Sequence, residues 1–152
     1  MGIEMSGFDE LCEMFGEMGQ EIDSVLEKAV ELGGAVIQGH IKLLCPVGDS
    51  GDLRRSITVN TERDEDGGYK AVIGTNLEYA PYVEFGTGIH STKAGRQDAW
   101  CYYDPESEYA NKDGFVWTKG SKPQPFMYPG FEQGKNEANA VAIAKIKEVL
   151  SG

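Results

Sequence analysis

The stretch FDELCEMFGEMGQEIDSVLEKAVELGGAVIQGHIKLL, residues 8–44, decides the fold of the first third of the chain. Its apolar residues recur every three or four positions, which is the spacing of one face of an α-helix. Five glycines interrupt the run, and each costs about 1 kcal/mol relative to alanine in a helix. We therefore expect a long amphipathic helix that lies on a sheet or on a neighbouring subunit, in preference to a free-standing coiled coil. The apolar positions are Phe8, Leu11, Phe15, Met18, Ile22, Val25, Ala29, Leu32 and Val36, and Leu26, Val30, Ile37 and Ile41 widen the stripe.

Two features bound this helix. The pair Gly33–Gly34 is the point at which it would kink or split. Pro46 ends it, because the residue before a proline is pushed out of the helical region of backbone space.

The next segment has the alternation of an antiparallel sheet. Apolar and polar residues alternate over 53–59, which predicts a strand, and a charged loop over 62–68 leads to a return strand over 69–75. A short helix over 79–85 follows, with Asn76 as its cap and Gly86 as its end.

Aromatic residues mark a second hairpin. Strands are expected over 99–103 and 115–118, joined by an acidic loop over 104–114. Three prolines then keep the chain extended up to residue 129, and a helix over 131–150 closes the sequence. The order predicts a single α+β domain over 1–152, with both long helices packed on a small antiparallel sheet. Its parts are the N-terminal helix (1–45), sheet and loops (46–120), an extended arm (121–130) and the C-terminal helix (131–152).

Charge is distributed unevenly along the 152 residues. The net charge is −11, and residues 1–31 hold nine acids and one lysine, which leaves only −3 for the remainder. A protein that clamps a nucleic-acid backbone needs the opposite sign. An acidic surface instead suits a conduit through which DNA slides without adhering.

The sequence offers little for catalysis or metal binding. The three cysteines and two histidines show no zinc-ligand spacing, so neither a metal nor another cofactor is expected, and the cysteines are expected to be reduced. Gly86-Thr87-Gly88 lacks the third glycine and the lysine of a phosphate loop and is interpreted as a turn. His40 is expected to be a hydrogen-bonded core residue, and His90 a solvated loop residue.

Three blocks built from turn formers and aromatics carry a family resemblance. They are Pro46-x-Gly48-x-x-Gly51-x-Leu53-Arg54-x-Ser56-Ile57, then Tyr79-Ala80-x-Tyr82-Val83-Glu84-Phe85-Gly86-Thr87-Gly88, and last Pro125-Phe126-Met127-x-Pro129. In this order they resemble the head–tail joining or tail-completion (neck) proteins of long-tailed bacteriophages and prophages, over roughly residues 20–150. The chain departs from that pattern at Gly130, where the family usually has alanine, and in its long acidic hairpin.

The resemblance implies a structural virion protein with no enzymatic activity. Such a protein forms a six-fold ring at the head-proximal end of the tail and is assembled in the host bacterial cytoplasm. Its implied partners are copies of itself and other head, neck or tail proteins, with DNA passing nearby and no membrane. The hypothetical subunit or partner interface comprises Arg54, Arg55, Tyr79, Tyr82, Glu84, Phe85, Gly86, Thr87, Pro125, Phe126, Met127 and Tyr128.

Two other classes remain open from the sequence. A small cytoplasmic regulatory binder would use the acidic N-terminal helix as a mimic of DNA and would capture a basic protein in a salt-sensitive way. A small hydrolase would use His90 with Asp98, and alanine at His90 would then abolish its activity.

Overall fold

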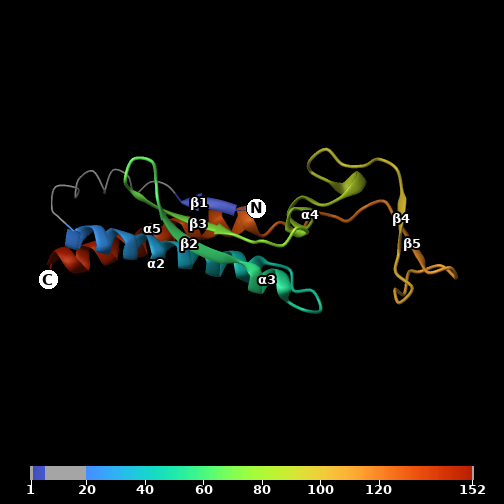
Figure 1. Cartoon of the computed structure of the whole chain (residues 1–152), viewed down its shortest axis with the longest axis horizontal. Helices are drawn as coiled ribbons and strands as arrows, with labels where there is room; N and C mark the ends of the chain where they lie inside the picture. Colours follow the sequence, from blue (N-terminus) through green and yellow to red (C-terminus); the bar gives the residue numbers. More distant parts are fainter. Residues whose placement is uncertain (1, 6–19, 152) are drawn as a thin grey trace. The chain divides into compact units, whose positions relative to one another are not determined.

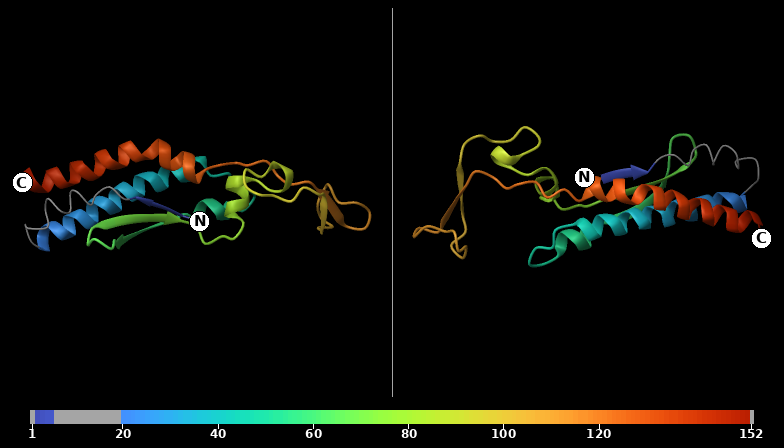
Figure 2. Two further views of the ribbon diagram at one scale, coloured as in Figure 1. Left: turned by 90° about the horizontal axis from the view of Figure 1, so that it is seen from above. Right: turned by 180° about the vertical axis from the view of Figure 1, so that it is seen from behind.

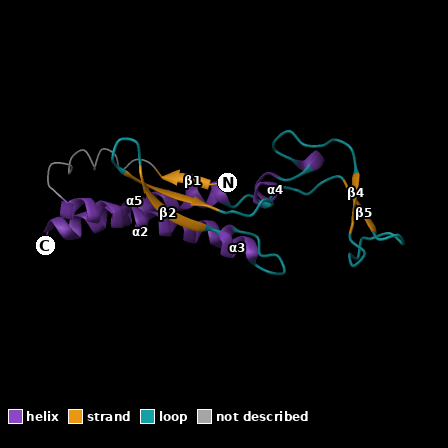
Figure 3. Ribbon diagram, in the orientation of Figure 1, coloured by secondary structure: helices purple, strands orange, loops and turns teal. Residues whose placement is uncertain are grey.

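The structure, a computed structural model, describes residues 2–5 and 20–151. The part of the predicted first helix before residue 20 lies outside these residues. The α+β class is confirmed, because the structure combines helices with two separate antiparallel sheets (Figures 1 and 3). The chain divides into two compact units, one built from residues up to Leu77 and from Phe126 onward, the other from Glu78–Pro125. The prediction of one domain over 1–152 stays a prediction.

In unit 1, the helix α2 (Gln20–Leu44) packs against a second long helix and against a sheet. It contacts α5 (Met127–Ser151) and a three-stranded sheet (Figure 2, left), and α5 also contacts one strand of that sheet. The strand order is β1-β3-β2, all antiparallel, with β1 at Gly2–Met5, β2 at Thr58–Arg63 and β3 at Tyr69–Gly74. No strand over 2–5 was expected from the sequence.

Because α2 is covered from two sides, its buried face differs from the predicted stripe. The side chains of Val25, Leu32 and Val36 are only half-buried. The fully covered positions are those expected to widen the stripe, with small residues beside them: Leu26, Ala29, Val30, Gly33, Gly34, Ile37 and Ile41.

Glycines in the two long helices set how closely the layers approach. A Cβ at Gly34 would lie 2.7 Å from a methyl of Val59 and 2.8 Å from the Cβ of Ala71, so the absence of a side chain lets the sheet approach α2. The helix is continuous through this position, so it does not split at Gly33–Gly34. A Cβ at Gly130 on α5 would lie 2.6 Å from the Cα of Ile41. This contact gives a physical reason for glycine where the resemblance leads one to expect alanine.

Gly130 and Gly39 form a matched pair for mutation. We expect Gly130→Ala to lower the free energy of unfolding by about 1–2 kcal/mol, because overpacking against the Ile41 backbone outweighs the gain of about 1 kcal/mol in helix propensity. Gly39 is an exposed position in α2 with no atom within 4 Å of its would-be Cβ, so Gly39→Ala should instead stabilise by about 0.5–1 kcal/mol. Urea denaturation measures both, and the same sign for the two variants would contradict this packing.

Three predicted boundaries are wrong. Residues Asp52–Ser56 form a short helix, α3, in place of the start of a strand. Leu53 and Ile57 are both buried, and their four-residue spacing fits one side of a helical turn as well as it fits a strand. The expected 121–130 arm is shorter, because α5 begins at Met127. Pro129 is tolerated there, since the first-turn N–H groups have no acceptor within the helix. The short helix α4 is capped at Tyr79 and not at Asn76.

The β2–β3 hairpin is fastened to α2 by one polar cluster. Tyr69 is buried and donates a hydrogen bond of 2.7 Å from its hydroxyl to Oδ2 of Asp23. The guanidinium of Arg63 donates to the same oxygen and lies 4.6 Å from the centre of the Tyr69 ring. The hydrogen bond from Tyr69 lowers the pKa of Asp23, with a smaller contribution from Arg63. Burial, assisted by the bond to Asp23, raises the pKa of Tyr69 to about 12.

This cluster makes stability depend on alkaline pH. The unfolded chain loses the Tyr69 proton near pH 10, whereas the folded chain holds it to about pH 12, so the stabilisation is complete below pH 10 and is lost between these values. We expect wild type to lose about 1–2 kcal/mol more than Tyr69→Phe between pH 9 and 11.5. Chemical denaturation of both proteins at several pH values measures it, and parallel curves would contradict the arrangement.

His40 and Glu137 link the two long helices. The Nε2 of His40 lies 2.8 Å from a carboxylate oxygen of Glu137 on α5. His40 is therefore hydrogen-bonded as expected, although its side chain is half-buried and does not belong to the core.

Candidate subunit interface

Unit 2 is built from two chain segments that run side by side. The first contains α4 (Ala80–Phe85) and the single turn η1 (Gly88–His90), and the second contains residues 119–124. Backbone N–H groups join them: Thr87 donates to Ser121 at 2.9 Å, Ile89 to Lys119 at 3.0 Å and Gln124 to Val83 at 2.8 Å. Beyond this junction, β4 (Trp100–Tyr103) and β5 (Phe115–Thr118) form a two-stranded ribbon, as the sequence predicted.

Glycine is required where the two segments meet. Gly88 and Gly120 have φ values of 59° and 119°, which side chains rarely adopt. A Cβ on Gly88 would lie 1.9 Å from the carbonyl oxygen of Lys119, and one on Gly120 would lie 2.0 Å from that of Thr87. Gly86, with φ of 74°, ends α4 as expected. The Gly-Thr-Gly block thus holds two backbone segments together and forms the turn that the sequence predicted.

Unit 2 has almost no interior. Of its side chains, only Ala80, Glu84 and Val116 are buried. A two-stranded ribbon is at best marginally stable in water without further packing. The same unit exposes eight large hydrophobic side chains, namely Tyr79, Tyr82, Ile89, Tyr102, Tyr103, Tyr109, Phe115 and Trp117.

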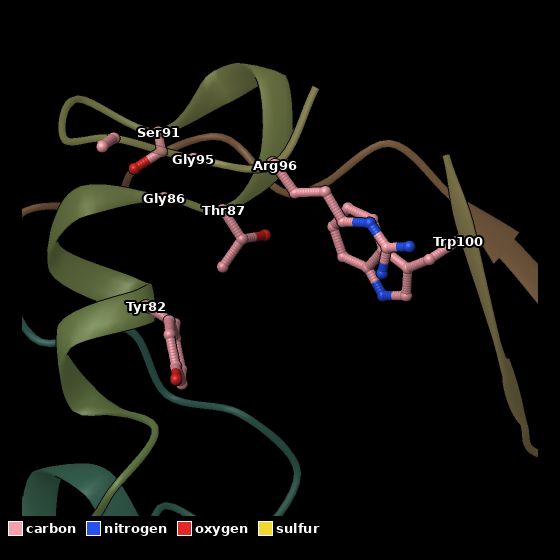
Figure 4. A pocket seen from close by; sticks show the side chains of 9 residues that line it. Tyr82, Gly86, Thr87, Ser91, Gly95, Arg96 and Trp100 are labelled. Atoms are coloured by element: carbon pink, nitrogen blue, oxygen red, sulfur yellow. The ribbon is translucent and has the colours of Figure 1, made fainter. Parts of the chain in front are cut away.

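A hollow of about 410 Å³ opens beside the junction (Figure 4). Tyr82 from α4 and Trp100 from β4 contribute to its lining, and the Arg96 guanidinium lies 5.7 Å from the Trp100 ring. The titratable side chains in the lining are Tyr82 and Arg96, so the lining contains no carboxylate or imidazole to act as a base. Aromatic walls with one cation suit the side chain of a partner, or an acidic group on it, better than they suit bond chemistry.

The hydrolase alternative depends on a pairing of His90 with Asp98. His90 is exposed in η1. Among the described residues, no hydrogen bond or ion pair joins its ring to Asp98. The same part of the chain contains no cluster of histidine, cysteine and acidic side chains suited to a metal. It also contains no helix of the length and apolarity needed to cross a membrane.

The twelve residues predicted for the interface fall into two groups. Six of them lie in α4 or directly beside it in unit 2. Tyr79 and Tyr82 are exposed there, and Glu84 is buried. The Phe85 ring has the Lys93 ammonium 4.1 Å from its centre, and the Thr87 hydroxyl accepts a bond from the Ser121 N–H. Pro125, at the end of unit 2, is exposed.

The other predicted residues belong to unit 1. Arg54 donates to the Cys45 carbonyl at 3.1 Å, and Arg55 pairs with Asp52 at the surface. Phe126 and Met127 are buried, whereas Tyr128 is 65% exposed. The structure therefore separates residues that anchor the chain from residues that are available to a partner.

The sequence predicts the two strands of the ribbon but not the exposure of their aromatic side chains. Tyr103, Phe115 and Trp117 are all exposed. The signal that could have found them is the period of two: in a two-stranded hairpin, residues on one face have no second layer to cover them.

Unit 2 thus combines an exposed aromatic surface and little interior with a hollow whose lining contains no acid–base arrangement. A family model described as "Bacteriophage HK97-gp10, putative tail-component" matches residues 9–86. The chain belongs to this family of phage tail components. No curated protein and no solved structure shows a significant match.

The matched range includes α2, the β2–β3 hairpin and α4. It ends at Gly86, so it is shorter than the resemblance over residues 20–150, and both the ribbon and the third block lie outside it.

Proposed function

We propose that this protein is a structural subunit of the virion that joins the phage tail to the head by forming a six-fold ring at the head-proximal end of the tail. It makes and breaks no covalent bond. Its partners are its own copies and other head, neck or tail proteins. It is assembled in the cytoplasm of the host bacterium.

The observation that carries this proposal is the imbalance in unit 2. Residues 78–125 bury three side chains and expose eight large hydrophobic ones. Monomeric proteins rarely expose large contiguous apolar patches, and where such patches occur they mark interaction sites. A ring subunit also needs two unlike patches, one for each neighbour. Exposed members of the predicted interface, namely Arg55, Tyr79, Tyr82, Pro125 and Tyr128, are proposed to contribute to them.

The charge of the chain supports a place on the path of DNA. A net charge of −11 repels the phosphate backbone, so DNA can pass without being held. Acidic side chains of the N-terminal helix also make contacts within the chain, which a mimic of DNA would not need. Asp23 accepts hydrogen bonds from Tyr69 and Arg63, and Glu31 forms an ion pair with Lys28.

Electron microscopy of particles made without this protein tests its function. We expect unjoined heads and tails to accumulate, and expression of the protein from a plasmid should restore joined particles. Light scattering of the purified protein, alone and with tail tubes, tests the ring. A subunit that stays solitary in both settings, with normal particles in its absence, would contradict the proposal.

A further inference from the structure

The two faces of the β4–β5 ribbon differ in how much aromatic surface they expose. Cross-strand partners share a face, so Cys101 and Tyr103 lie on the same side as Trp117 and Phe115. All four are exposed, Tyr103 by 66% and Trp117 by 65%. The Tyr103 and Phe115 rings meet edge to face, with centroids 5.4 Å apart. We call this side the aromatic face. The opposite side has Val116 buried, Trp100 half-buried and Tyr102 47% exposed.

The end of the ribbon is preformed. The side chain of Asn111 accepts hydrogen bonds from the N–H of Asp113 at 2.9 Å and of Phe115 at 3.0 Å, and Asp104 donates to Gly114 at 2.9 Å. A segment with this internal bonding loses little conformational entropy on docking. It is therefore suited to insert into a partner.

Opposite charges gather at the two ends of unit 2. Residues 104–113, the acidic tip, carry four acids and one lysine. Residues 86–99 and 119–122, the basic root, carry four bases and one aspartate. Among the described residues, no ion pair joins the tip to the root. The basic side chains of the root are Lys93, Arg96, Lys119 and Lys122.

The acidic tip is too far from the basic root of the same subunit for the two sets of charges to interact strongly. Four residues per strand span about 13 Å, which exceeds the screening length of about 8 Å at physiological ionic strength. Both charge sets are thus available to a second molecule. Since each copy carries both, the chemically complementary partner for one unit 2 is another unit 2.

We infer that the ribbon of one subunit docks, aromatic face inward, on the basic root of the next copy in the ring. This inference rests on the proposed function and names its contact. The acidic tip meets Arg96, Lys119 and Lys122 of the neighbour, and the aromatic face covers its exposed Tyr82 and Ile89. In the ring this contact is heterologous and repeats from copy to copy until the ring closes, whereas a reciprocal two-fold pairing of tip and root would stop at a dimer.

A pair of neighbouring tyrosines tests the aromatic face. Tyr103→Ser removes an aromatic from that face, while Tyr102→Ser removes one from the opposite side of the same strand. We expect the first to raise the dissociation constant of self-association at least tenfold, about the effect of losing an interface hot spot, and the second to change it less than threefold. Light scattering over a dilution series measures both.

Charge reversal tests the orientation. Glu106→Lys with Glu108→Lys at the tip should weaken association at least about tenfold in low salt, and so should Lys119→Glu with Lys122→Glu at the root. All four changes in one chain should restore association, because each copy again carries matched ends. Glu65→Lys with Asp66→Lys, in the exposed β2–β3 turn, makes the same change in charge elsewhere and should have little effect. Circular dichroism confirms folding of each variant.

The outcomes separate this inference from the proposed function. Rings that form equally well with the Tyr103, tip and root variants would overturn the inference and leave the ring standing. Reaction of Cys101 with a thiol reagent gives an independent readout: the exposed thiol should react in the dilute subunit and be protected in the ring. Equal reaction in both states would also overturn the docking. Failure of the wild type to associate with itself under any condition would remove both proposals.

Discussion

Replacing Phe126 by alanine will lower the free energy of unfolding of unit 1 by about 3–5 kcal/mol, the usual cost of removing a buried aromatic ring. Among the residues that the structure describes, Phe126 is the largest side chain that is fully buried, and it lies one residue before α5 begins. Its loss leaves a cavity in the core and frees the point at which the chain returns from unit 2. Urea unfolding followed by far-UV circular dichroism gives the value.

Tyr128 is the matched control for this change. It lies two residues further on, was predicted for the same interface, and is 65% exposed. Tyr128→Ala should cost at most about 1 kcal/mol, as surface substitutions do. If both variants lose similar stability, Phe126 does not have the core role assigned to it. If neither variant loses stability, Phe126 is not packed in the core as described.

Gly120→Ala is expected to abolish the ordered junction of unit 2 while unit 1 stays folded. The φ of 119° is costly for any residue with a side chain, by about 1–3 kcal/mol, and the added Cβ would meet the Thr87 carbonyl oxygen at 2.0 Å. That oxygen belongs to backbone, so relief requires the two segments to separate. The hydrogen bonds that join residues 87–89 to 119–121 would then be lost.

The two tryptophans make this result measurable. Trp100 and Trp117 both lie in unit 2, so tryptophan fluorescence and near-UV circular dichroism report on it, whereas far-UV helical signal comes mainly from α2 and α5. We expect the tryptophan signals to change and the helical melting transition to move by less than about 2 °C. Gly48→Ala, at an exposed loop glycine with open space around it, should change neither. Loss of the helical melting transition in Gly120→Ala would contradict the claim that unit 1 folds independently of the junction in unit 2.

The long-range pattern of the sequence predicted the main elements well. Sustained three–four spacing predicted α2, and glycine at residue 86 predicted the end of α4. The wrong boundaries share one cause: short segments satisfy two periods at once. Leu53 and Ile57 fit either a strand or a single helical turn, and Pro129 is compatible with an arm or with the first turn of α5.

The candidate site was harder to predict than the fold. The sequence shows that residues 79–131 are rich in aromatic side chains, but it does not show which of these side chains are buried. Phe126 and Trp117 look equivalent in the sequence, and only the arrangement in space buries one and exposes the other. Neither does the sequence reveal that Gly88 and Gly120, 32 positions apart, require each other's close approach.

The scarcity of buried side chains in residues 78–125 bears on any thermal measurement of this protein. Unit 1 carries its own hydrophobic interior, so its melting temperature should be independent of dilution. In the inferred ring, unit 2 obtains most of its packing from neighbouring copies, so its melting temperature should rise with protein concentration, as mass action requires. A single thermal scan would then show two transitions, and only one of them would depend on protein concentration. The difference between the two melting temperatures would report the extent of assembly.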